Sequence, residues 1–154
     1  MGRLLVPFIL PFASSWVHRQ ERRILRDGIP LSSMQIADAC TVGVAHPERV
    51  RVLHVSTVPL PGHWLSGVAR YFGGASMSDT SGLSASYGIY IRARFAADRQ
   101  LLVHELTHTH QYERMGGIRP FLRQYLEECL TVGYLNAGME LEARSAAERV
   151  CAPG

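Results

Sequence analysis

Two histidines and a glutamate lie within five consecutive residues of this chain, in the stretch His104-Glu105-Leu-Thr-His108. Residues four apart on an α-helix lie about one turn apart on the same face, so both imidazoles can point at one metal ion. Glu105 directly follows the first histidine, where its carboxylate can reach a water bound to that ion. The spacing therefore predicts two zinc ligands, His104 and His108, and a general base, Glu105.

The motif lies in the middle of a stretch, residues 98–115, whose pattern predicts a single helix. Asp98 can cap the N-terminus of this helix, and the pair Gly116-Gly117 can end it. Buried imidazoles without partners are costly. Two of them at ligand spacing beside a glutamate therefore indicate a metal site rather than a plain core helix.

A catalytic zinc ion usually has three protein ligands and one open position for water, so a third ligand is required. The downstream candidates are Glu127, Glu128, Glu140, Glu142 and Glu148. The segment 139–150 has helical composition, with Met139, Ala143, Ala146 and Val150 on one face. Glu142 lies at the edge of that face, whereas Glu140, Arg144 and Glu148 form a line of alternating charge typical of a solvated face. Because a ligand must point inward, the pattern favours Glu142 over Glu140.

The longer string from Leu101 to Met115, LLVHELTHTHQYERM, resembles small bacterial zincin-like domains, which often read HELxHxxQ with Gln111 as the last residue. A Glu-Ala pair on a later helix resembles the gluzincin branch of zinc metallopeptidases. The resemblance covers roughly residues 85–150. It implies an α+β domain in which a small sheet packs on the motif helix, further C-terminal helices, a glutamate third ligand, and zinc-dependent hydrolysis of a peptide or protein substrate. The metzincin continuation H-x-x-G-x-x-H is absent, which argues against an all-histidine site.

Some domains of this type are associated with secretion or contractile-injection systems. The alternative function is therefore a zinc-binding assembly or interaction module that hydrolyses nothing. A third alternative is a helical interaction protein without metal. In a chain this short, a partner protein that completes the cleft is a further expectation.

Peptide hydrolysis also needs a donor for the oxyanion, and gluzincin-like sites often supply a tyrosine or histidine. The candidates here are Tyr134, His110 and Tyr112, of which Tyr134 is our prediction. His110 lies on the same helix as His108 but points about 200° away from it. For Tyr112, a packing role explains the residue as well as a role as oxyanion donor. Carboxylates often orient metal-binding histidine rings. Asp38, Asp79 and Glu113 are candidates for this role, and the sequence does not choose among them.

The segment 87–94 alternates apolar and polar residues, which predicts a half-buried strand. Such a strand just before a zincin motif helix typically aligns an extended substrate by backbone pairing at the sheet edge. The alternative is an ordinary strand within the sheet.

The remaining elements follow from periodicity and turn residues: helices over 15–26, 33–40, 62–69 and 120–130, a strand over 50–58, and turns with a hairpin over 71–88.

Length and composition suggest one domain, residues 1–154, with 47% hydrophobic and 19% charged residues. The net charge is +3, and all 16 basic residues are arginines. Four of them, Arg19, Arg22, Arg23 and Arg26, form a helical patch. We interpret this patch as a solvated face, with no nucleic-acid partner.

Three cysteines without C-x-x-C spacing make neither a disulfide framework nor a thiolate zinc site, which favours the cytoplasm. Residues 1–14 begin with a short basic region followed by an apolar stretch, as a weak signal peptide or an N-terminal arm would. Two prolines and the lack of an A-x-A site count against export, which stays the alternative location. No segment is long enough to span a membrane.

Overall fold

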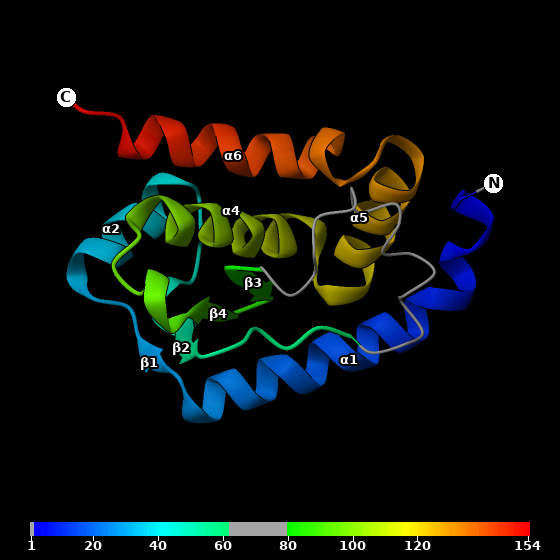
Figure 1. The fold of residues 1–154 in the computed structure, drawn as a ribbon, viewed down its shortest axis with the longest axis horizontal. Helices are drawn as coiled ribbons and strands as arrows, with labels where there is room; N and C mark the ends of the chain where they lie inside the picture. Colours follow the sequence, from blue (N-terminus) through cyan, green and yellow to red (C-terminus); the bar gives the residue numbers. More distant parts are fainter. Residues whose placement is uncertain (1, 62–79) are drawn as a thin grey trace.

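The computed structural model of the chain describes residues 2–61 and 80–154. It is a mixed α+β fold, as predicted, with five α-helices and a four-stranded sheet among the described residues (Figure 1). The helices are α1 (Val6–Asp27), α2 (Ser33–Thr41), α4 (Arg99–Met115), α5 (Ile118–Val132) and α6 (Gly138–Cys151). The strands are β1 (Ile29–Pro30), β2 (Arg51–Val55), β3 (Gly82–Ala85) and β4 (Gly88–Arg92). Short 3-10 turns are η1 (Gly2–Leu4), η2 (Pro47–Arg49), η6 (Ala93–Phe95) and η7 (Tyr134–Asn136). The expected helix over 62–69 and the first part of the expected hairpin segment lie outside the described residues.

The sheet has the strand order β1-β2-β4-β3, in which β2 and β4 are parallel and the two outer pairings are antiparallel. The strand expected over 87–94 is present as β4, but it is an internal strand. Ile89 pairs with Val52 on one side and with Ser84 on the other. The expectation that this strand offers a free edge to a substrate is therefore wrong, because β3 covers that edge.

Helix α1 begins at Val6, about two and a half turns before the helix start expected at Ser15. The sequence misleads here because Pro7 and Pro11 favour a break. Pro7 lies in the first turn, where its missing N–H costs nothing, and Pro11 removes one helical hydrogen bond. Packing outweighs that loss, since Val6, Leu10, Ala13 and Val17 are all buried in the core. The stretch expected as an arm or weak signal thus contributes core residues.

Helix α4 lies between the sheet and α6, and α5 crosses near its C-terminal end (Figure 1). The predicted boundaries of α4 are confirmed. The side chain of Asp98 accepts a hydrogen bond from the Leu101 N–H at 2.9 Å. At the other end Gly116 adopts a left-handed conformation with φ of 90°, which favours glycine. Pro120 lies in the first turn of α5, as expected. None of the described helices is long and apolar enough to span a membrane.

Candidate metal centre

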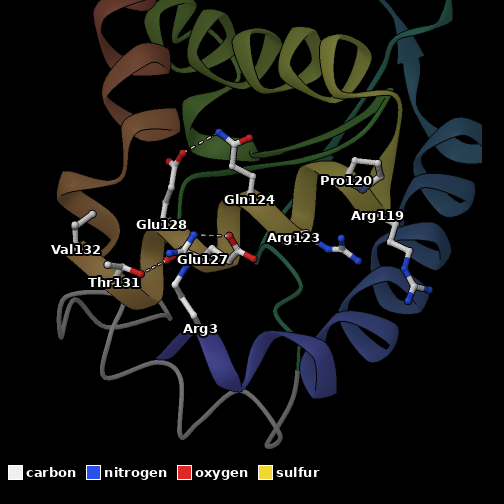
Figure 2. A pocket seen from close by; sticks show the side chains of 9 residues that line it. All are labelled: Arg3, Arg119, Pro120, Arg123, Gln124, Glu127, Glu128, Thr131 and Val132. Atoms are coloured by element: carbon white, nitrogen blue, oxygen red, sulfur yellow. Dashed lines mark hydrogen bonds and ion pairs between the residues drawn. The ribbon is translucent and has the colours of Figure 1, made fainter. Parts of the chain in front are cut away.

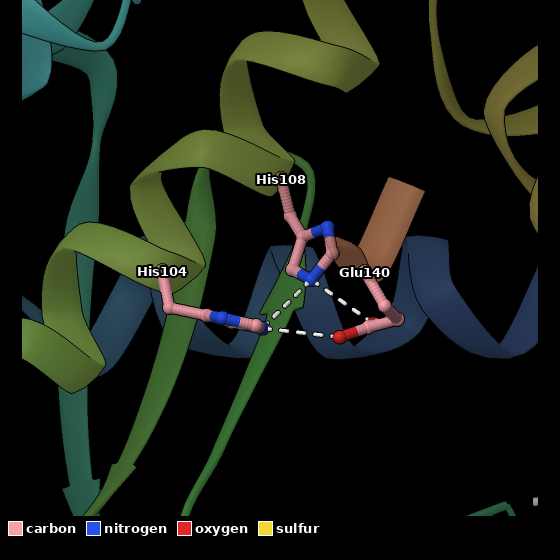
Figure 3. A group of neighbouring side chains, drawn as sticks. All are labelled: His104, His108 and Glu140. Atoms are coloured by element: carbon pink, nitrogen blue, oxygen red, sulfur yellow. Dashed lines mark hydrogen bonds and ion pairs between the residues drawn. The ribbon is translucent and has the colours of Figure 1, made fainter. Parts of the chain in front are cut away.

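Three side chains converge where α4 faces the first turn of α6: His104, His108 and Glu140 (Figure 3). The Nε2 atoms of the two histidines lie 3.2 Å apart. The Glu140 carboxylate faces both, with Oε2 at 3.2 Å from His104 Nε2 and Oε1 at 3.2 Å from His108 Nε2. The side chain of Glu140 is 2% exposed, and that of His104 is 19% exposed. The described residues contain one such group of potential metal ligands.

The donor set fits a zinc ion. Tetrahedral zinc with ligands at about 2.0–2.1 Å places neighbouring ligand atoms roughly 3.3–3.4 Å apart. The observed separations of 3.2 Å are close to that value. In addition, Glu140 Oε2 is buried without a hydrogen bond of good geometry from any described residue. Because buried polar atoms are nearly always satisfied, a cation between the three side chains would complete the site.

The pKa values of His108 and Glu140 show that a positive charge is favoured between these side chains. Burial lowers the pKa of His108, but the hydrogen bond and charge of Glu140 outweigh burial and raise this pKa to about 9. Burial raises the pKa of Glu140, whereas the two histidines and Tyr125 lower it well below its usual range. Without metal, a proton on His108 compensates the Glu140 carboxylate, and a metal ion would take over that role.

The third side chain is Glu140 and not Glu142, which corrects the choice made from the helical pattern. Glu140, Ala143 and Ala147 are spaced i, i+3, i+7 and lie on one buried stripe of α6. The apolar face expected from Met139, Ala143, Ala146 and Val150 does not include Ala147, and it is therefore turned toward Glu142. In the structure the Glu142 carboxylate is 39% exposed and pairs with Arg114 at 2.8 Å.

Gln111 orients the ring of His108, and sequence reasoning assigned it no role. It is fully buried, and its Oε1 lies 2.8 Å from His108 Nδ1. The spacing of three residues after His108 on one helix is a signal that could have revealed the contact. The carboxylates proposed for this role are used elsewhere or lie outside the described residues. Asp38 pairs with Arg99 at 2.8 Å, Glu113 accepts the Tyr87 hydroxyl at 2.9 Å, and Asp79 is not described.

Glu105 follows His104 on α4, and its carboxylate lies close to β3. The residue is 5% exposed, and burial raises the pKa of its carboxylate. The charges of His104 and His108 lower this pKa, and the charge of Glu140 raises it further. A Cβ at Gly82 would lie only 2.9 Å from Glu105 Oε1, so the glycine allows β3 to approach this carboxylate closely.

Two tyrosines contact Glu140. The Tyr125 hydroxyl donates a hydrogen bond to Glu140 Oε1 at 2.7 Å, a contact that the sequence did not indicate. Tyr134, the predicted oxyanion donor, also lies against Glu140. Burial is the main cause that raises the pKa of Tyr134 far above its usual value, and the charge and hydrogen bonding of Glu140 add to it. Its hydroxyl therefore stays protonated and able to donate.

The other two donor candidates do not join the centre. The ring of His110 lies against Gly43, where an added Cβ would be 2.9 Å from it. Tyr112 stacks on Phe121 with ring centroids 3.6 Å apart, and its hydroxyl lies 3.4 Å from the Ser84 carbonyl oxygen. Packing accounts for the positions of both.

The start of α6 is held by a side chain from α5. The Met139 N–H donates to Glu128 Oε2 at 2.9 Å, and Gln124 donates to the other oxygen of Glu128 at 3.0 Å. Because α6 has no side-chain cap of its own, Glu128 satisfies one of its free N–H groups next to Glu140.

Glu128 and Gln124 also line a surface pocket of about 740 Å³ (Figure 2). Its other lining residues are Arg3, Arg119, Pro120, Arg123, Glu127, Thr131 and Val132. Within α5, Arg123 is two residues from both Phe121 and Tyr125, which flank His108, and so points about 200° away from each. None of His104, His108 and Glu140 lines this pocket.

Comparisons of the chain with protein-family models, curated proteins and solved structures give no match. The assignment of the centre therefore rests on the geometry of His104, His108 and Glu140.

Proposed function

We propose that this protein is a zinc-dependent peptidase of the zincin-like type. The observation that carries the proposal is the convergence of His104, His108 and Glu140, whose ligand atoms lie 3.2 Å apart. The buried Glu105 directly follows His104 on α4 and is coupled electrostatically to both histidines. Two histidines and a carboxylate leave a fourth position for water, as in catalytic rather than structural zinc sites. Glu105 is the acid–base residue that such a site needs.

Zinc, when bound, supplies Lewis-acid activation of a water molecule and of the scissile carbonyl group. Glu105 takes a proton from the attacking water and delivers it to the leaving amine. Tyr134 turns its hydroxyl from Glu140 and donates a hydrogen bond to the oxygen that becomes negatively charged. Tyr125 fixes one oxygen of Glu140 and so orients the carboxylate toward the histidines.

The second candidate function is a zinc-binding assembly module, and the edge of the sheet favours it. The Thr109 hydroxyl donates a hydrogen bond to the Ser86 carbonyl oxygen at 2.9 Å, and the Tyr112 hydroxyl lies 3.4 Å from the Ser84 carbonyl oxygen. Side chains of α4 thus occupy one carbonyl oxygen of β3, at Ser84, and one in the turn that follows it, at Ser86. These groups are not free to pair with an extended substrate. A peptidase must bind its substrate in another way, for example with a partner protein that completes the cleft, whereas an assembly module needs no such groove.

The test is a Glu105→Gln variant assayed with a quenched fluorescent peptide library. We expect the variant to keep its zinc and to lose activity by about 10²- to 10⁴-fold, the usual contribution of a general base. The matched control is Glu113→Gln, which makes the same change on the same helix. The Glu113 carboxylate accepts hydrogen bonds from the Tyr87 hydroxyl and from the backbone N–H groups of Ala45 and His46, and not from the residues of the centre.

Full activity in zinc-loaded Glu105→Gln protein would contradict the mechanism. Wild-type protein that holds one zinc but cleaves no peptide would favour the assembly module instead.

A further inference from the structure

A chain of three side chains links the surface of the protein to His108. Arg114 donates to both oxygens of Glu142, at 2.8 and 2.9 Å. Glu142 Oε2 accepts a hydrogen bond from Gln111 Nε2 at 2.8 Å, and Gln111 Oε1 lies 2.8 Å from His108 Nδ1. Arg114 and Glu142 are 46% and 39% exposed, whereas Gln111 is fully buried.

The partners of Gln111 dictate which way its amide points. Besides Glu142, the amide nitrogen donates to the carbonyl oxygen of Met139 at 3.0 Å. A carboxylate and a carbonyl can only accept, so the NH₂ group must face them and Oε1 must face His108. A flipped amide would instead bring its oxygen against two acceptor oxygens, and neither contact could form a hydrogen bond.

The orientation of Gln111 in turn fixes the proton on His108. Because Oε1 can only accept, Nδ1 of His108 must carry the proton that it donates. The lone pair available to a metal is then on Nε2, the atom that faces His104 and Glu140. The opposite tautomer would place a proton where the metal has to bind.

We propose that Glu142, held by Arg114, is a positioning residue that fixes Gln111 and thereby keeps the Nε2 lone pair of His108 directed at the metal. This inference rests on the proposed zinc function and adds a means of control from the surface. Glu142 does not bind the metal, yet the affinity for zinc depends on it. Changes at an exposed ion pair are thus transmitted to a buried ligand.

The test measures zinc affinity by competition with a chromophoric chelator in Gln111→Leu, Glu142→Ala and Glu142→Gln proteins. We expect Gln111→Leu to weaken zinc binding by about 10- to 100-fold, the usual effect of removing a partner of a metal ligand. We expect Glu142→Ala to weaken it less, and Glu142→Gln to keep near wild-type affinity because its amide oxygen still accepts from Gln111. Glu148→Ala, the same change at an exposed site of α6, is the matched control.

A second readout separates positioning from general stability. NMR of the zinc-loaded wild-type protein should show an exchange-protected Nδ1–H of His108. We expect this proton to exchange with solvent faster in Glu142→Ala and at the wild-type rate in Glu148→Ala. Thermal unfolding of the metal-free proteins is measured in parallel.

Zinc affinity and Nδ1–H protection that are unchanged in Glu142→Ala and Gln111→Leu would overturn the inference, even if both variants unfold at lower temperature. This outcome differs from a failure of the peptidase proposal, in which zinc affinity depends on Glu142 but no peptide is cleaved. A wild-type protein that binds no zinc would overturn both.

Discussion

The two carboxylates at the start of α6 stand two residues apart and have opposite surroundings. Glu140 is 2% exposed and faces His104, His108 and Tyr125, whereas Glu142 is 39% exposed and pairs with Arg114. An exposed ion pair contributes little to stability. A buried carboxylate is costly unless its charge is fully compensated. The difference indicates that the surroundings of Glu140 suit a cation, while Glu142 lies outside the group of potential ligands.

Removal of metal is the strongest way to test this difference. Zinc at about 1,000 times its dissociation constant adds about 4 kcal/mol to the free energy of unfolding. For a chain of this size the unfolding temperature should rise by about 8–16 °C. Calorimetry with zinc and with a chelator would measure it. We expect no zinc-dependent rise in Glu140→Ala protein and a clear rise in Glu142→Ala protein, and equal rises in the two would contradict the assignment.

Acid should weaken zinc binding. Because the pKa of His108 is about 9 without metal, zinc must displace a proton below that pH, and its affinity should fall about tenfold per pH unit. The metal-free fold has the opposite dependence. Its His108 pKa lies above the ordinary value of about 6.5, so the Glu140 contact stabilises the fold fully below pH 6.5 and is lost as pH rises through 9. Calorimetry at pH 6 and 8 should thus show a larger zinc effect at pH 8, and a larger effect at pH 6 would contradict the account.

Tyr125→Phe should weaken the centre without removing a ligand. The variant loses the 2.7 Å hydrogen bond to Glu140, and hydrogen bonds to charged groups contribute about 1.5–3 kcal/mol. We expect zinc affinity to fall by roughly tenfold or more, as chelator competition would measure. Tyr87→Phe removes a similar bond to Glu113 at 2.9 Å and should lower stability but leave zinc affinity unchanged. An equal loss of affinity in both variants would show that general destabilisation is responsible.

The smallest expected effect is at Arg114. Its pair with Glu142 is half exposed, and such pairs contribute about 0.2–1 kcal/mol. Arg114→Gln should therefore reduce zinc affinity by less than about fivefold, and by less still in high salt. A loss as large as that in Tyr125→Phe would mean that the Glu142 side of α6 is part of the centre itself.

The parts of the site that lie on one helix could be predicted from the sequence. Helix α4 begins after Asp98 and ends at Gly116 as the capping residues indicate, and it places His104 and His108 on one face. These features depend on local geometry alone, which a sequence pattern records well. The mixed α+β class was also predictable from alternating periodicities.

The parts that depend on packing between elements could not be predicted. Whether Glu140 or Glu142 faces α4 depends on the rotation of α6, and the apolar pattern of a short alanine-rich helix does not fix it. The internal position of β4 depends on strand order, which periodicity does not record. The early start of α1 depends on burial of Val6 and Leu10, which outweighs the local preference of Pro11.

The most direct test of the account is the zinc content of tag-free protein, measured by elemental mass spectrometry on wild type, His108→Ala, Glu140→Ala and Glu142→Ala. We expect about one zinc per chain in the wild type, its loss in His108→Ala and Glu140→Ala, and its retention in Glu142→Ala at saturating zinc. Folded wild-type protein without zinc, or loss of zinc from Glu142→Ala but not from Glu140→Ala, would contradict it.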